Sequence, residues 1–222
     1  VDSFHNYDKE ELLSEFESDL KLSLTRKISL NPILNGFQYV VHKYGIEQEM
    51  IDAFLASMKS DLHKSIYNTQ EDYDKYIFGS ADVVGLMCLK VFVQGNNETY
   101  EALKPYAMSL GSAFQKVNFL RDIKDDTELL HRSYFPNVDT NNLTIESKKH
   151  IIQDIENDFD NAVIGIKLLP KDVRFGVYTA YIYYLKLFLK LKNTAVEDIL
   201  TSRIRVSNPV KIGLLAKSFV SF

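Results

Sequence analysis

Glycine and proline are scarce in this chain of 222 residues, which holds only 9 glycines and 5 prolines. So few turn-forming residues argue against a collagen-like chain and against a β architecture with many turns. Cys88 is the only cysteine, which excludes an internal disulfide and a cluster of thiolates around a metal. A mostly helical protein of a reducing compartment, the cytoplasm, is therefore expected.

An excess of positive charge is also lacking, because 26 lysines and arginines stand against 30 aspartates and glutamates. The net charge of −4 offers no general attraction for nucleic acid, so no nucleic-acid partner is expected. The longest apolar stretch, residues 83–93, is interrupted by Lys90 and is shorter than the roughly 20 residues that span a bilayer. The apolar residues at the C-terminus could cover the core or rest on a membrane surface as a peripheral contact: Leu214, Leu215, Phe219, Val220 and Phe222.

Hydrophobic residues recur with helical spacing along the whole chain. The pattern predicts helices over residues 8–27, 32–44, 47–65, 69–93, 98–124, 145–168, 172–192, 196–204 and 209–220. Pro105 should kink or divide the fifth of these helices. No linker or internal repeat separates them, so we expect a single all-α domain over residues 1–222. The chain starts with Val1 rather than methionine, which favours the loss of an N-terminal portion.

One predicted helix carries a polar stripe. At about 100° per residue, four polar side chains fall within a band of roughly 80°: Gln115, Asn118, Asp122 and Asp126. The opposite side of the helix is apolar and is expected in the core: Ala113, Val117 and Leu120. Phe119 and Ile123 border the stripe with apolar surface. A polar stripe with apolar borders suggests the wall of a cavity.

Asp122 and Asp126 stand one helical turn apart, where two negative charges repel by about 0.2–0.5 kcal/mol. A divalent cation would relieve this repulsion, and Mg²⁺ typically binds one or two carboxylates together with water and substrate phosphate oxygens. Mn²⁺ accepts the same oxygen ligands. A solvated acidic helix end, neutralised by neighbouring lysine and arginine, is the commoner reason for a bare pair of aspartates. The adjacent Gln115 and Asn118 favour the metal interpretation.

The same helix carries a longer constellation of residues. It reads G-S-A-F-Q-K-V-N-F-L-R-D-I-K-D-D over residues 111–126, followed by R-S-Y-F-P over residues 132–136. This run resembles the second aspartate-rich signature of the squalene and phytoene synthase family, G-x-A-x-Q-x-x-N-x-x-R-D-x-x-x-D with R-x-Y-x-P. A second stretch, from Met58 through Tyr76 to Gly85, is similar to the segment upstream of that signature. The resemblance covers nearly the whole chain and is greatest to bacterial phytoene synthases.

The resemblance implies an all-α isoprenoid-synthase (terpenoid synthase) fold, a helical bundle around a central cavity in which two aspartate-rich helices hold Mg²⁺ against prenyl diphosphates. It implies catalytic roles for the stripe, with Asp122 and Asp126 as metal ligands and Gln115 and Asn118 in the reaction site. The residues that would bind substrate are Arg132, Tyr134 and Tyr181, together with Phe119, Ala81 and Ser80. Ser80 and Ala81, together with the adjacent Gly79, are small enough to let isoprenoid tails pass between helices, although close helix packing explains these residues equally well.

The first aspartate-rich helix of the family should lie upstream of this sequence. Asp2 is the candidate for its last carboxylate and third metal ligand, so most of the first metal site is missing. Asp82 stands where the family usually has a small residue, and it could cap a helix break or approach the metal. Asp154 and Asp158 belong to an acidic run that is expected to be a solvated helix face.

The reaction implied by the resemblance is the head-to-head condensation of two prenyl diphosphates through a cyclopropylcarbinyl diphosphate. Two geranylgeranyl diphosphates would give phytoene without a reductant, and two farnesyl diphosphates would give squalene or dehydrosqualene. NADPH is expected only for squalene, and the sequence lacks a glycine-rich dinucleotide motif, which favours phytoene. An alternative of another class is a non-catalytic relative that acts as an assembly factor, because fold alone does not establish activity.

Overall fold

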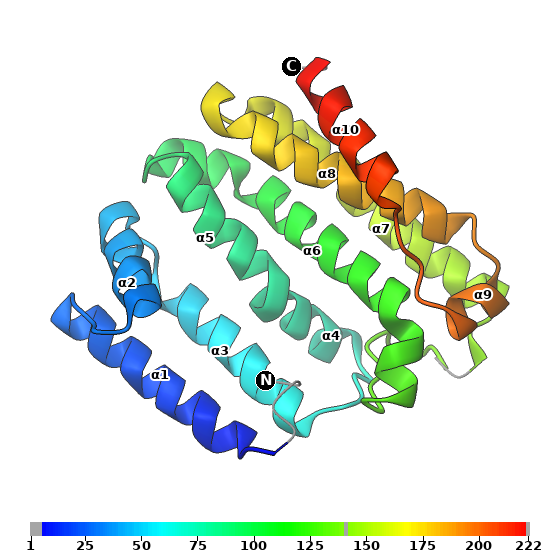
Figure 1. The fold of residues 1–222 in the computed structure, drawn as a ribbon, viewed down its shortest axis with the longest axis horizontal. Helices are drawn as coiled ribbons and strands as arrows, with labels where there is room; N and C mark the ends of the chain where they lie inside the picture. Colours follow the sequence, from blue (N-terminus) through cyan, green and yellow to red (C-terminus); the bar gives the residue numbers. More distant parts are fainter. Residues whose placement is uncertain (1–5, 140–141, 221–222) are drawn as a thin grey trace.

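The computed structural model describes residues 6–139 and 142–220, in which all the regular structure is helical (Figure 1). In chain order the elements are α1 (Lys9–Arg26), α2 (Pro32–Tyr44), α3 (Gln48–His63), α4 (Gln70–Ile77), η1 (Phe78–Asp82), α5 (Val83–Phe92), α6 (Asn97–Glu128), α7 (Ile145–Leu168), α8 (Lys171–Lys192), α9 (Val196–Thr201) and α10 (Asn208–Val220). The predicted all-α class is confirmed. None of the described helices combines the length and the apolar character that crossing a membrane requires.

The helix ends follow from capping residues. The side chain of Asp8 accepts hydrogen bonds of 3.0 Å from the backbone N–H groups of Glu10 and Glu11, which begins α1. Asn31 caps α2 in the same way, directly before a proline. Gly45 ends α2 with a φ of 64°, a left-handed conformation that glycine adopts without strain. These local signals explain why the predicted and observed helix bounds agree closely.

Two predicted helices differ from the observed ones. The segment expected as one helix over residues 69–93 consists of α4 and α5 joined by η1, a π-helical turn of five residues. Conversely, Pro105 does not divide α6, which runs without interruption over 32 residues. The proline removes one backbone N–H, and the carbonyl group left without that donor belongs to the exposed Glu101, where water can satisfy it.

Helix α6 lies in the middle of the molecule, between α5 on one side and α7 and α8 on the other (Figure 1). Side chains of α4, α7, α8 and α9 pack around its second half, where Val117 and Leu120 are fully buried. A separate cluster from α1, α2, α3 and α5 packs around Tyr100 and Leu103 in its first half. Ala113 is also fully buried, so the predicted apolar side of this helix is confirmed as core.

Two glycines allow η1 and α5 to approach the backbone of α6. A Cβ atom on Gly111 would lie 2.7 Å from the carbonyl oxygen of Ala81, and one on Gly85 would lie 2.7 Å from the carbonyl oxygen of Ala107. Real Cβ atoms do not come so close to backbone oxygen, because the overlap is repulsive. Larger residues at either position would therefore force α5 and α6 apart.

Candidate active site

Helix α6 places the predicted polar stripe along one side, and all four of its side chains are half-buried: Gln115, Asn118, Asp122 and Asp126. The amide Nε2 of Gln115 donates to Ser80 Oγ at 3.4 Å. The Tyr184 hydroxyl donates to Asn118 Oδ1 at 3.5 Å. Both hydrogen bonds are long, so the two amides retain donors and acceptors for a ligand.

Asp122 is paired with two guanidinium groups. The Nε atom of Arg121 donates to its Oδ1 at 2.9 Å, and a terminal nitrogen of the same arginine reaches its Oδ2. Arg203, in the segment after α9, brings its Nε to 2.8 Å from Asp122 Oδ1. Lys124 donates to the carbonyl oxygen of Thr201 at 2.9 Å, which fastens the same segment to α6. Sequence reasoning missed Arg203.

Asp126 has little compensation for its charge. Burial raises the pKa of Asp126 to about 7, the negative charge of Asp122 adds to this shift, and Arg132 opposes it. Two carboxylates on one helix face supply the hard oxygen donors that Mg²⁺ and Mn²⁺ prefer, and a bound cation would relieve the repulsion between them. The residues therefore fit a divalent metal.

The donor set for such a metal is incomplete within residues 6–139 and 142–220. No group of three or more histidine, cysteine, aspartate or glutamate side chains there could hold an ion. Asp126 and Asp122 would bind an ion from one side and leave its other positions to water and phosphate oxygens. Asp2, the third expected ligand, lies outside the described residues.

Arg132 and Tyr134 follow α6 in a segment that returns toward α3. An Nη2 atom of Arg132 donates to the carbonyl oxygen of Asp61 at 2.7 Å. Tyr134 is 7% exposed and stacks on Phe119, with 4.0 Å between ring centroids. Burial raises the pKa of Tyr134 to about 12, so its hydroxyl stays protonated near neutral pH. Both rings belong to a buried aromatic cluster rather than to the cavity wall, contrary to the expected position of Phe119 beside the cavity.

A cavity of about 510 Å³ lies between α5, α6, α7 and α8. Ser80, Ala81 and Gln115 line it together with mostly apolar side chains, so the small residues and one stripe residue share one wall. It extends along η1 and α5 from Ser80 to Phe92, roughly 18 Å at 1.5 Å per helical residue. A long apolar cavity of this size fits an extended hydrocarbon chain.

Gly79, next to Ser80, has a different role. A Cβ atom there would lie 2.6 Å from the carbonyl oxygen of Ala53 on α3, so this glycine allows close helix packing. Close packing thus explains Gly79, whereas the passage of isoprenoid tails beside Ser80 and Ala81, which line the cavity, stays a prediction.

Tyr181 does not contact the polar stripe. Its ring is 7% exposed and packs edge-on against Phe159, with 5.6 Å between centroids. Tyr184, almost one helical turn further along α8, contacts the polar stripe instead, because its hydroxyl donates to Asn118 Oδ1. Its ring also stacks on Phe114, a cavity residue, with 3.9 Å between centroids. Tyr184, and not Tyr181, is therefore the tyrosine of α8 that contacts the polar stripe.

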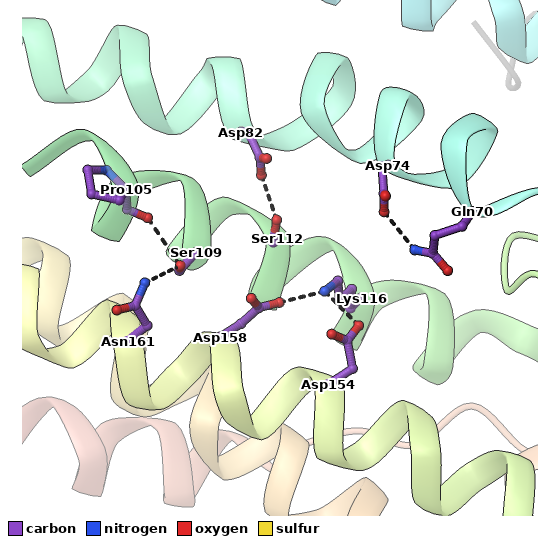
Figure 2. Close-up of polar contacts among 10 residues, drawn as sticks. All are labelled: Gln70, Asp74, Asp82, Pro105, Ser109, Ser112, Lys116, Asp154, Asp158 and Asn161. Carbon is purple, nitrogen blue, oxygen red and sulfur yellow. Dashed lines mark hydrogen bonds and ion pairs between the residues drawn. The ribbon is translucent and has the colours of Figure 1, made fainter.

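A second polar network lies on another side of α6 (Figure 2). The Ser112 hydroxyl donates to Asp82 Oδ1 at 2.7 Å. The Lys116 ammonium lies 2.6 Å from Asp154 Oδ2 and 2.8 Å from Asp158 Oδ2. Asp82 and Lys116 are 7% and 8% exposed, so these contacts tie η1, α6 and α7 together inside the protein. The expected solvated face is wrong for Asp158, whose side chain is 19% exposed.

The network continues along α6 toward Pro105. Asn161 of α7 donates its Nδ2 hydrogen to Ser109 Oγ at 2.6 Å, and Ser109 Oγ donates to the Pro105 carbonyl oxygen at 3.1 Å (Figure 2). Asp82 thus lies in the π-helical turn, but its side chain accepts from Ser112 on α6 and makes no capping hydrogen bond at the start of α5.

Replacing Asp82 with asparagine is expected to stabilise the protein at high pH. Burial raises the pKa of Asp82 from 3.8 to about 6 against the opposing influence of Ser112 and Lys116. An acid with a higher pKa in the folded state destabilises the fold when ionised; this effect is absent below about pH 4, grows up to about pH 6 and is complete above it. Asp82→Asn still offers Ser112 an acceptor.

We expect the free energy of unfolding of Asp82→Asn to exceed that of the wild type by about 1–3 kcal/mol at about pH 8, with no gain at about pH 4. Urea unfolding at the two pH values measures both differences. A variant less stable than the wild type at high pH would contradict this account of Asp82.

Known proteins resemble this chain in sequence and in fold. Residues 1–209 match the family described as Squalene/phytoene synthase. The chain is 28% identical over 199 residues to a 15-cis-phytoene synthase of Enterobacter agglomerans, covering 83% of this chain and 65% of the relative. It is also 28% identical over 182 residues to a 15-cis-phytoene synthase of Synechocystis sp., covering 71% and 53%. The chain thus spans just under two thirds and about half of the lengths of these two relatives.

Solved structures show the same fold. A dehydrosqualene synthase in complex with ligand superposes with a TM-score of 0.78 at 20% identity, covering 96% of this chain and 78% of the other. The squalene synthase HpnC from Alicyclobacillus acidocaldarius superposes with a TM-score of 0.71 at 18% identity, covering 86% and 76%. The predicted fold is confirmed, and the chain belongs to the squalene/phytoene synthase family.

Proposed function

We propose that this chain carries out the divalent-metal-dependent, head-to-head condensation of two prenyl diphosphates. One observation carries the proposal: a single helix, α6, presents Asp122 and Asp126 at one end of a polar stripe whose other end, Gln115, lines a long apolar cavity. This arrangement matches a substrate with a diphosphate head and a hydrocarbon tail. Mg²⁺, or Mn²⁺ in its place, would be held by the two carboxylates.

The bound metal would supply positive charge to the diphosphate as it leaves. The chain's own residues perform the other tasks. Arg203 and Arg132 provide further positive charge near the carboxylates, and Arg203 could turn from Asp122 to the diphosphate. The apolar cavity excludes water, which would otherwise quench an allylic carbocation. The stacked rings of Phe114 and Tyr184 present π faces that stabilise positive charge beside the stripe.

The reaction proposed for these groups proceeds in two ionisations. In the first, the C–O bond of one substrate breaks, the double bond of the second attacks the cation, and a lost proton leaves cyclopropylcarbinyl diphosphate. In the second, this intermediate loses its diphosphate, rearranges and releases a proton. We propose geranylgeranyl diphosphate as substrate and phytoene as product, supported by relatives that are named phytoene synthases. This outcome needs no NADPH, which only squalene formation would require.

The test is incubation of the protein with Mg²⁺ and labelled geranylgeranyl or farnesyl diphosphate, followed by measurement of released diphosphate and identification of the product. We expect phytoene from the longer substrate. Dehydrosqualene or squalene as the main product would replace the proposed substrate with farnesyl diphosphate. Absence of diphosphate release from a folded protein with either substrate would contradict an enzymatic role and favour the non-catalytic alternative.

Filling the cavity should impair use of the longer substrate. Cys88 lines the cavity with its side chain exposed to the open space, so Cys88→Phe can add volume without disturbing the packed core. We expect kcat/KM for geranylgeranyl diphosphate to fall by roughly tenfold or more, with less effect on farnesyl diphosphate and an unchanged unfolding midpoint. Cys88→Ser is the control of unchanged volume. Equal losses for both substrates would argue against a tail at this position.

A further inference from the structure

Three aliphatic side chains are exposed where α1 turns into α2. We call residues 26–33 the α1–α2 corner. Ile28 is 64% exposed, Ile33 is 76% exposed, and Leu30 is completely exposed. The corner lies at the outer edge of the molecule, at the left of Figure 1. Such exposure of neighbouring large aliphatic side chains is unfavourable in water and marks a surface that contacts an apolar partner.

Along the sequence, the segment that forms this corner carries charges of one sign, and the acids Glu17 and Asp52 lie beside Lys21. Residues 20–46 contain no aspartate or glutamate but include Lys21, Arg26, Lys27 and Lys43, in a chain whose net charge is −4. Lys21 is paired with Glu17 at 2.8 Å. Arg26 and Lys27 are both exposed, and no ion pair engages either of them in the described part of the chain. Their positive charges are therefore available to an anionic partner.

Three backbone amides of the corner donate to side chains of the same segment. Asn35 Oδ1 accepts from the Ser29 amide at 3.1 Å, and Ser29 Oγ accepts from the Asn31 amide at 3.1 Å. Asn31 Oδ1 accepts from the amide of Ile33 at 3.0 Å. Pro32, between them, has no N–H to satisfy. The loop can consequently enter a region of low water content with a smaller desolvation penalty than an open loop would have.

From these three features we infer that the α1–α2 corner docks onto the surface of an anionic lipid bilayer. Leu30, Ile33 and Ile28 enter the boundary between headgroups and acyl chains, while Arg26 and Lys27 contact the negative headgroups. This combination of exposed aliphatic side chains and unpaired cations is the chemistry of peripheral membrane binding. The corner projects outward as a tip rather than forming a groove, which suits a fluid surface better than a folded partner.

The absence of tryptophan from the chain allows a direct test. Leu30→Trp introduces a single fluorophore at the tip, and Ile145→Trp introduces one at a distant aliphatic residue that is 79% exposed. We expect vesicles of equal parts phosphatidylcholine and phosphatidylglycerol to shift the emission of Leu30→Trp to the blue, with quenching by brominated lipid, and to leave Ile145→Trp unchanged. An unshifted emission of Leu30→Trp overturns the inference, whether or not the protein sediments with the vesicles.

A variant without the charges of Arg26 and Lys27 tests their role in membrane binding. The double variant Arg26→Gln/Lys27→Gln is expected to bind the mixed vesicles roughly thirtyfold more weakly, because each charge near an anionic surface contributes about 1 kcal/mol. The matched control is Lys171→Gln/Lys186→Gln on α8. Equal binding of both double variants, or equal binding of the wild type to pure phosphatidylcholine, overturns the role of the charges. These measurements use no prenyl diphosphate, so their failure and a failure of the proposed reaction are separate results.

Discussion

Asp126→Asn is expected to reduce kcat by roughly a hundredfold or more, because the neutral amide can no longer help to hold a cation against the leaving diphosphate. The same change should not weaken the fold. Burial and Asp122 raise the pKa of Asp126 to about 7, so its negative charge lowers the stability of the fold increasingly above about pH 4 and fully above about pH 7. A variant that is inactive and at least as stable as the wild type is thus the signature of a functional carboxylate.

Steady-state kinetics with saturating Mg²⁺ measure kcat, and urea unfolding measures the free energy of unfolding. Calorimetric titration of Mg²⁺ in the presence of inorganic diphosphate measures the affinity for the metal. Glu128→Gln, an exposed acid half a turn further along α6, is the matched control and should keep kcat within about twofold. Retention of most activity in Asp126→Asn would place the metal elsewhere. A large loss of stability in this variant would show instead that the carboxylate is structural.

The largest stability effect is expected from Lys116→Met. Lys116 is the cation of the buried network, and its loss leaves Asp154 and Asp158 without their partner next to the buried Asp82. Removing one member of a buried ion pair typically lowers the free energy of unfolding by about 3–5 kcal/mol. Methionine has nearly the same shape as lysine, so the effect reports charge rather than packing.

The double variant Lys116→Met/Asp158→Asn should regain a large part of that loss, since it removes the buried charge left behind. Lys186→Met, at an exposed position of α8, is the control and should change the free energy of unfolding by less than about 0.5 kcal/mol. Urea unfolding of the four proteins at neutral pH measures the differences. If the double variant is as unstable as the single one, the network does not act through charge.

The parts that sequence reasoning predicted well are those governed by local rules. The caps at Asp8 and Asn31 act on backbone groups two or three residues away, so their positions alone predict the helix starts. The polar stripe of α6 follows from helical spacing in the same way. The metal role was argued from the spacing of Asp122 and Asp126 and strengthened by the resemblance of a long motif to a family, and the metal and diphosphate roles remain predictions.

Contacts between distant segments could not be read from the sequence. Arg203 lies 81 residues from Asp122, and Asp82 lies 30 residues from Ser112, so no local spacing connects the members of either pair. The exchange of Tyr181 for Tyr184 has a similar cause, because both tyrosines lie on α8 and only its packing decides which one faces Asn118. Helical periodicity predicts that a helix has two sides but not which neighbour each side contacts.

The π-helical turn has a consequence for sequence change in this part of the chain. Such a turn accommodates one more residue than an α-helix of equal rise. Deleting one residue from Phe78–Asp82 would let α4 run straight into α5 as one regular helix, and α5 would keep nearly its present rotation about its axis because the turn already holds one residue in excess. Val84 and Cys88 would then still face the cavity, so the loss of one residue here would alter only the part of the wall that Ser80 and Ala81 form.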